Sequence, residues 1–444
     1  FLMQHWNKIY SRRCWINNQF VPATISIEQN KIVGIRFIKD DNAIDFGNAV
    51  IMPGCIDAHV HINEPGRTEW EGFETATLAA AAGGITSIVD MPLNSSPVTT
   101  TVEALNTKKN AAAGNLNVNI GFYGGVVPGN ENEIDGLCKN GVLGIKAFLT
   151  HSGIDEFPNV ERQELDAVMP VLKKYGIPLL VHCELSDDQH KAGLKNHPSE
   201  YNAYLNSRPD EWEIKAIKLM IELCTRHYCK THIVHVSSAQ SLGIIENAKA
   251  THLPLTAETC PQYIYFSAGE IKDGETMYKC APPIRSKDNN GLLKIALKKG
   301  ILDFIASDHS PAPPYLKEMK SGSFEKAWGG IAGLQFLLSA TYTALADTSP
   351  LEKIIPLLTA NPASFLGLEK KGKLAAGMDA DIVIWQPEES FKVETENILH
   401  KHKLTPYLDR LLYGKVIATM VNGIVVFYEN NIINKNTGTW LTKK

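Results

Sequence analysis

The chain has 444 residues, of which 44% are hydrophobic and 21% charged, and its formal net charge is −4. Its 44 basic residues are scattered, so charge indicates neither a nucleic-acid partner nor an anionic membrane surface. No apolar run approaches the ~20 residues that a membrane span needs. The first 13 residues lack the apolar core of a secretory signal, so we expect a cytoplasmic enzyme, although a chain that begins with Phe can lack its true start.

From residue 50 onward, short β-rich segments alternate with segments of helical periodicity, such as 71–82 and 211–226. The predicted strands are 50–62, 85–91, 118–126, 144–149, 178–184, 231–237, 254–259 and 301–307. Eight strand–helix units favour an α/β fold, a parallel (β/α)8 TIM-like barrel. The eight cysteines are dispersed along the chain, mostly in apolar contexts, and are expected to be reduced core thiols.

Both flanks of this region have a different pattern of short β-rich strands separated by turn residues. The flanking strands are 23–27, 31–35, 380–385 and 418–426. We therefore predict that both chain ends build one small β-sandwich domain beside the barrel. The expected boundaries are 1–50 and 369–444 for the sandwich and tail, and 51–368 for a metal-dependent hydrolase barrel.

The most informative local feature is His59-Val60-His61, at the end of the first predicted barrel strand. Alternate residues of a strand face the same way, so both imidazoles can converge on one borderline ion such as zinc. A His-x-His pair also arises by chance on solvent-facing strands. The interpretation of this pair as metal ligands therefore depends on further ligand-type residues elsewhere in the chain.

In a parallel barrel the active site lies at the carboxyl ends of the strands. The ligand-type residues that fall at this rim are His59, His61, Lys146, His182, His235 and Asp308. Taken singly, each histidine fits a hydrogen-bonded core residue, the aspartate a turn and the lysine a snorkelling side chain. Their clustering is not explained by those interpretations, whereas a binuclear metal site predicts it.

Lys146 needs separate chemistry, because an ammonium cannot ligate a cation. A neutral lysine can add carbon dioxide, and the resulting carbamate (N6-carboxylysine) is an anionic bridge suited to two ions about 3.5–4 Å apart. The predicted site places His59, His61 and Asp308 on one ion and His182 and His235 on the other, with the carbamate and a hydroxide bridging them. Zinc is the expected metal, and manganese, cobalt or iron also suit this ligand set.

Seven segments together resemble the cyclic-amidohydrolase branch of the amidohydrolase superfamily, and within that branch the allantoinases. They are 59–67 (HVHINEPGR), 70–74 (WEGFE), 91–94 (MPLN), 144–148 (GIKAF), 257–261 (AETCP), 280–285 (CAPPIR) and 307–311 (SDHSP). The stretch 372–381 likewise resembles the return of such chains to their small β-domain. The resemblance implies hydrolytic opening of the hydantoin ring of (S)-allantoin to allantoate, a step of purine degradation, and a homotetramer.

The resemblance also suggests roles around the metals. Asp308 would accept the hydroxide proton and pass it to the departing ring nitrogen. Backbone groups around Cys280 would grip the ring, and His151 would reach the developing oxyanion. His151 is also explained as a solvated loop residue.

Asn63 separates the favoured substrate from its nearest rival. Dihydroorotases with a similar Glu-Pro-Gly element usually carry Arg at the corresponding place, where it pairs with a carboxylate. Allantoin is neutral, so the amides of Asn63 and Asn94 suit it better, unless Asn63 only shapes the turn before Pro65. Dihydroorotase, dihydropyrimidinase or hydantoinase, and a catalytically inactive scaffold related to dihydropyrimidinase remain alternatives.

Overall fold

The computed structural model describes residues 6–442 and contains two parallel sheets. The six-stranded sheet has the order β14-β13-β12-β11-β10-β9, and the three-stranded sheet has the order β6-β7-β8. Their bounds are β6 Cys55–Val60, β7 Ile85–Asp90, β8 Asn119–Phe122, β9 Gly124–Gly125, β10 Ile145–Phe148, β11 Leu179–His182, β12 Thr231–Ile233, β13 Leu255–Thr259 and β14 Phe304–Ile305. The expected α/β fold with parallel strands is thereby confirmed.

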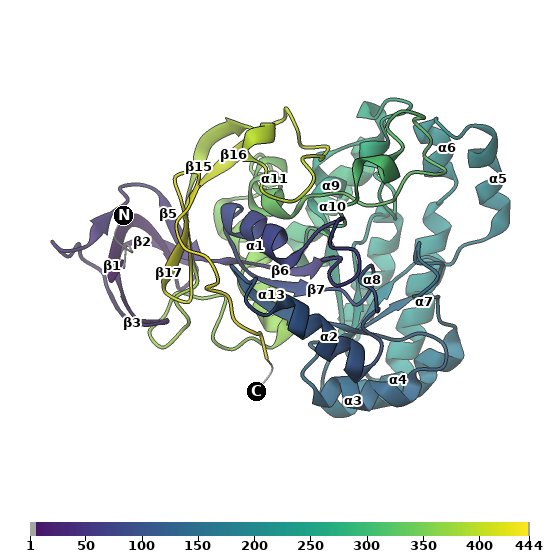
Figure 1. The fold of residues 1–444 in the computed structure, drawn as a ribbon, viewed down its shortest axis with the longest axis horizontal. Helices are drawn as coiled ribbons and strands as arrows, with labels where there is room; N and C mark the ends of the chain where they lie inside the picture. Colours follow the sequence, from purple (N-terminus) through teal and green to yellow (C-terminus); the bar gives the residue numbers. More distant parts are fainter. Residues whose placement is uncertain (1–5, 443–444) are drawn as a thin grey trace.

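Helices lie around these strands and follow them along the chain (Figure 1). They are α1 Phe73–Ala82, α2 Val102–Ala112, α3 Ile134–Lys139, α4 Arg162–Tyr175, α5 Asp188–Asn196, α6 Tyr201–Asn206, α7 Asp210–His227, α8 Leu242–Ala250, α9 Pro261–Tyr265, α10 Lys287–Lys299, α11 Leu337–Leu345, α12 Leu351–Leu358 and α13 Ala360–Leu366. None of the helices between residues 6 and 442 combines the length and apolarity needed to cross a membrane.

Local sequence explains where these helices begin and end, as α10 illustrates. The Ser286 side chain accepts a hydrogen bond from the backbone N–H of Asn289, which satisfies one of the amides left unpaired at the helix start. Gly300 ends the helix in the left-handed region, with φ of 74°. Leu293 and Leu297 are buried on the face that packs inward.

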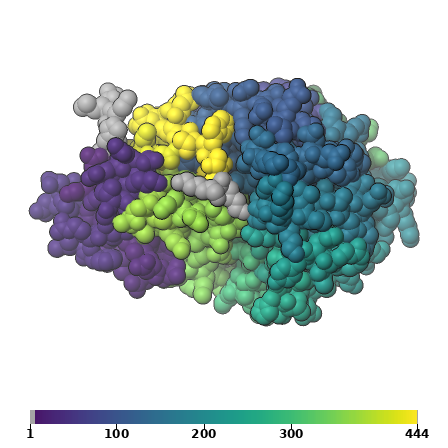
Figure 2. All heavy atoms as spheres, turned by 90° about the horizontal axis from the view of Figure 1, so that it is seen from below, coloured from purple at the N-terminus to yellow at the C-terminus, as the bar shows by residue number. Residues whose placement is uncertain are grey.

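The remaining strands form one nine-stranded sheet that joins both ends of the chain. Its order is β18-β17-β16-β15-β5-β1-β2-β3, and β4 pairs with β1. The bounds are β1 Lys8–Ile16, β2 Gln19–Glu28, β3 Lys31–Arg36, β4 Ile44–Asp45, β5 Val50–Pro53, β15 Ile382–Lys392, β16 Leu411–Val421, β17 Ile424–Tyr428 and β18 Asn431–Ile432. Figures 1 and 2 show the purple N-terminal and yellow-green C-terminal segments together at one end of the molecule.

The stretch 50–62, expected as one strand, is two strands in different sheets. β5 pairs with β1 and β15, whereas β6 pairs with β7. Gly54 separates them, and a Cβ atom at this position would lie 2.2 Å from side-chain atoms of Thr86. The chain therefore changes sheets at a residue where a side chain does not fit.

Candidate metal centre

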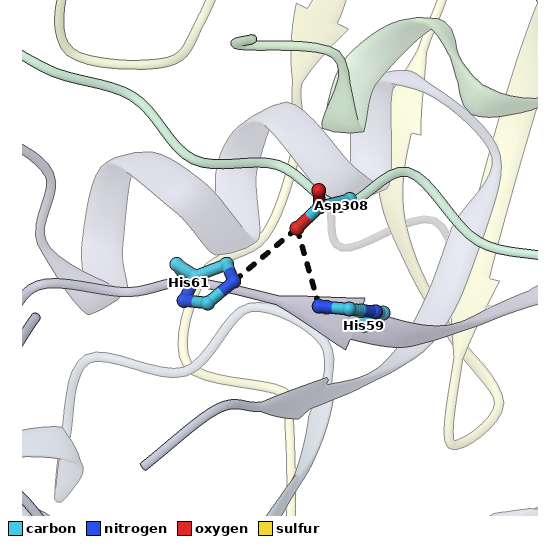
Figure 3. Close-up of side chains that lie close together, drawn as sticks. All are labelled: His59, His61 and Asp308. Carbon is cyan, nitrogen blue, oxygen red and sulfur yellow. Dashed lines mark ion pairs between the residues drawn. The ribbon is translucent and has the colours of Figure 1, made fainter. Parts of the chain in front are cut away.

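Three of the predicted ligands meet at the carboxyl end of β6 (Figure 3). One carboxylate oxygen of Asp308 lies 3.1 Å from His59 Nε2 and 3.2 Å from His61 Nε2. Both imidazoles are almost fully buried, and burial lowers the pKa of His61 to about 4, so this ring is neutral at pH 7. Burial alone would raise the pKa of Asp308, but His59 outweighs it and holds that pKa well below its usual value. Burial by itself lowers the pKa of His59, but the carboxylates of Asp308 and Glu258 outweigh it and raise that pKa. A divalent ion needs neutral imidazoles and an anionic carboxylate as donors, so its binding here would release a proton from His59.

The register of the parallel strands brings the other predicted ligands to the same place. Lys146 pairs with Leu180 and Phe148 with His182, so both ligand strands end at one level. The His182 and His235 rings are 4.6 Å apart, and the His59 and His235 rings 5.5 Å apart, between centroids. All six predicted ligands line one cavity of about 470 Å³.

Lys146 is fully buried, and its ammonium group has no hydrogen-bond partner in the part of the chain that the structure describes. Burial lowers the pKa of Lys146 to about 8, although the nearby Asp308 and Glu258 oppose that shift. A buried, unpartnered amine is costly in its charged form and more readily neutral. The neutral amine is the form that adds carbon dioxide, so this residue fits the predicted carbamate.

Two glutamates that the sequence analysis missed orient the histidines. Glu258 Oε1 lies 2.5 Å from His59 Nδ1, and Glu184 Oε2 lies 2.6 Å from His182 Nε2. Each carboxylate can accept a hydrogen bond from one ring nitrogen, so that the other nitrogen would be the one to bind an ion. The signal for Glu184 was present in the sequence, because it follows His182 by two residues, on the same face of an extended segment.

Asp57 joins the two chain segments that carry the first ligand group. Its Oδ1 accepts hydrogen bonds from the backbone N–H groups of His59, at 3.2 Å, and Ser307, at 3.1 Å. Burial raises the pKa of Asp57 to about 7. The residue preceding Asp308 is therefore tied directly to the strand that carries His59.

The four predicted substrate contacts fall in different places. Asn94 lines the cavity, with Nδ2 3.5 Å from His61 Nδ1, and His151 lines its exposed rim, 3.3 Å from Asp155. Asn63 and Cys280 are buried and are not among the residues that line the cavity. The amide of Asn63 donates to Pro311 O at 3.4 Å, and the carbonyl of Cys280 accepts from Tyr204 Oη at 2.7 Å.

The chain is similar to known proteins over most of its length. The family model described as "Amidohydrolase family" matches residues 50–426. The chain belongs to the amidohydrolase family. Its members include relatives that cover nearly all of this chain: the allantoinase of Arabidopsis thaliana is 44% identical over 95% of this chain and 88% of the relative. The mitochondrial allantoinase of Aquarana catesbeiana is 46% identical over 81% and 75%.

The fold of the chain is also similar to a solved structure. The L-hydantoinase (dihydropyrimidinase) from Arthrobacter aurescens superposes with a TM-score of 0.90 at 28% identity, covering 98% of this chain and 99% of that one. The resemblance to the allantoinases drawn from the sequence motifs is thereby confirmed, and the chain is a hydrolase of the amidohydrolase family.

Proposed function

We propose that this protein is an allantoinase, which hydrolyses one ring amide of the hydantoin of (S)-allantoin to give allantoate. The observation that carries the proposal is the convergence of six ligand-type side chains on one cavity, in a chain whose relatives at 44–46% identity are allantoinases. The cavity, about 470 Å³, is within the range of small-molecule sites.

The metal site would hold two divalent ions, with zinc as the expected metal. His59, His61 and Asp308 would hold one ion, His182 and His235 the other, and carboxylated Lys146 would bridge them. When bound, such ions polarise a carbonyl oxygen and lower the pKa of water. The unpartnered, buried amine of Lys146 and the glutamates behind His59 and His182 support this assignment.

The chain's own residues would handle the proton and the substrate. Asp308, held in its anionic form, would accept a proton from the attacking water and deliver it to the departing ring nitrogen. Asn94 is the amide best placed to meet the substrate, because it lines the cavity and its buried Oδ1 has no partner within residues 6–442. Roles for Asn63, the Cys280 segment and His151 stay predictions.

We further propose that the parallel strands close into an eight-stranded barrel over 51–368. β8 and β9 are continuous through Tyr123, and a parallel bridge joins Val60 of β6 to His309 beyond β14. The nine-stranded sheet, with strands between Lys8 and Pro53 and between Ile382 and Ile432, would form the small β-sandwich predicted for 1–50 and 369–444, and it extends a few residues past the predicted boundary at 50. Its strands share a core of their own, which includes Ile25, Ile51 and Ile384.

A homotetramer is proposed from the family resemblance, and the cytoplasm is the location proposed from the sequence. The name of the frog relative includes the word mitochondrial, so location needs its own measurement. Size-exclusion chromatography with light scattering tests the tetramer.

Turnover by a metal-replete preparation tests the function. We expect hydrolysis of allantoin to be far faster than that of dihydroorotate, dihydrouracil or hydantoin, because the relatives at 44–46% identity are allantoinases. Dihydropyrimidinase is the second candidate, favoured by the structural match to the Arthrobacter aurescens enzyme. Faster opening of dihydrouracil than of allantoin would select it.

Matched variants link any activity to this cavity. Asp308→Asn keeps the side-chain shape but loses the anion, and it should abolish turnover. Asp347→Asn, at an exposed position away from the cavity, should leave turnover unchanged. Absence of stoichiometric metal, together with no turnover of any of these amides, would instead indicate a scaffold.

A further inference from the structure

His309 directly follows Asp308, and its contacts hold the backbone on that side of the proposed metal ligand. The backbone at Asp308 is left-handed, with φ of 47°, a conformation that is unfavourable for a residue other than glycine. Such a conformation persists only where the surrounding structure fixes it. On one side, the N–H of Ser307 is bonded to Asp57. On the other side, the backbone carbonyl of His309 accepts a hydrogen bond from the N–H of His61 at 2.8 Å.

The ring of His309 is fully buried, and its two nitrogens face different partners. Nδ1 accepts a hydrogen bond from the backbone N–H of Leu334 at 3.3 Å, so the proton of the neutral ring lies on Nε2. Within residues 6–442, Nε2 has no acceptor at hydrogen-bond distance, and it lies 3.6 Å from Oε2 of Glu71. The carboxylate of Glu71 is therefore the anion that this buried N–H faces.

Glu71 is a fully buried carboxylate that lies two residues before α1 and does not line the cavity. Burial by itself raises the pKa of Glu71, but the contact with His309 outweighs it and lowers that pKa, so the side chain is anionic at neutral pH. The backbone N–H of Lys401 approaches both carboxylate oxygens, at 3.1 and 3.3 Å. A buried anion held in this way gives the ring of His309 a fixed electrostatic partner.

Segment 397–401, which lies between β15 and β16, holds both partners of the His309 ring. It supplies the backbone N–H that binds the carboxylate, and it also binds Gln335, the residue after Leu334. The side-chain oxygen of Gln335 accepts from the N–H of Leu399 at 2.8 Å, and its amide donates to the carbonyl of Asn397 at 2.6 Å. The C-terminal part of the chain therefore supports the backbone beside Asp308, although no residue between 369 and 442 lines the cavity.

We propose that Glu71 is a positioning residue for Asp308 and acts through the ring of His309. The proposal rests on the metal site proposed above. Glu71 would attract the Nε2–H of the ring, the ring would hold the backbone of His309, and Asp308 would keep its direction toward the first ion. Segment 397–401 would thereby contribute to metal binding without contacting the metals.

Zinc affinity, measured by competition with a chelator on folded protein, tests this inference without relying on turnover. Glu71→Gln keeps the shape of the side chain but removes its charge, and it should weaken zinc binding by about tenfold. Asp381→Asn is the matched control, because Asp381 is also buried but binds Lys371 and Asn119 and does not line the cavity. Unchanged affinity in Glu71→Gln would overturn the inference alone, whereas a wild type that binds no zinc would overturn the metal site with it.

A double-mutant cycle decides whether Glu71 acts through His309. His309→Phe keeps a ring but removes both nitrogens, and adding Glu71→Gln to it should cause no further loss of zinc affinity. Additive losses would show that Glu71 supports the fold independently of His309, and would overturn the inference.

The kinetic constants separate positioning from a general loss of structure. At saturating zinc, Glu71→Gln should lower kcat for allantoin by about tenfold and leave KM within about twofold, because Glu71 does not line the cavity. A change confined to KM would indicate a disturbed cavity rather than a displaced Asp308, and would also overturn the inference. A wild type that binds zinc but does not open allantoin would contradict the proposed function, and the zinc affinities would still decide the inference.

Discussion

Glu258→Gln tests whether the carboxylate behind His59 fixes that ring for metal binding. Glu258 is fully buried, with one oxygen 2.5 Å from His59 Nδ1 and the other 3.1 Å from His232 Nε2. Burial by itself raises the pKa of Glu258, but His59 and His232 outweigh it and lower that pKa to about 2. At neutral pH the carboxylate can therefore accept hydrogen bonds from both rings, and an ion would bind His59 through Nε2 once that nitrogen has lost its proton.

The substitution keeps the side-chain shape but removes the charge and replaces one acceptor with an NH2 donor. Losing a charge-assisted hydrogen bond costs about 1.5–3 kcal/mol. Loss of such a supporting carboxylate weakens metal binding by about 10–100-fold, or about 1.4–2.7 kcal/mol. The two free-energy ranges overlap, so we expect the metal dissociation constant to rise by about 10–100-fold.

Metal affinity is measured by competition with a chelator of known affinity, on folded protein verified by circular dichroism. Glu213→Gln is the matched control, because Glu213 is also a buried carboxylate but binds Arg285, at 2.9 Å, and the backbone of Ser237, at 3.0 Å. It should lower stability and leave metal affinity unchanged. Wild-type metal affinity in Glu258→Gln would refute the argument that this carboxylate orients His59.

Two further outcomes follow from buried residues. Lys146→Ala should lose bound metal and turnover together, as measured by elemental analysis and allantoin hydrolysis. A short carboxylic acid could occupy the place of the missing carbamate and restore part of the activity. Full activity of the variant without such an acid would show that no carbamate is needed. Gly330→Ala should lower the free energy of unfolding by about 1–3 kcal/mol, because a Cβ there would lie 2.2 Å from the carbonyl oxygen of Ser310. Gly243→Ala, in α8 with no atom within 4 Å of the added carbon, should be neutral or stabilising in the same denaturant titration, and equal losses in both variants would contradict this reasoning.

Local patterns were enough to predict the strands that carry the ligands. Alternation within one strand places His59 and His61 on one side, whatever the rest of the chain does. The position of Asp308 directly after a predicted strand likewise assigns it to the rim of a parallel sheet. The structure brings these three side chains together as a group that could hold a metal ion.

Tertiary structure decided the features that depend on pairing between distant segments. Glu258 is 199 residues from His59 in sequence, and only the register of the strands brings the two within hydrogen-bond distance. The close approach of Gly54, where the chain changes sheets, to the side chain of Thr86 is likewise not revealed by any local pattern.

The direction in which a side chain points is decided in the same way. Asn63 was expected to face the substrate, but it is fully buried against Pro311 and is absent from the cavity lining, so Asn63→Arg would test folding as much as specificity. Lys279 lines the cavity, but a lysine beside a cysteine has no distinguishing pattern in the sequence. Its place on the cavity wall arises from contacts with residues about 50 positions away, which are set when the chain packs.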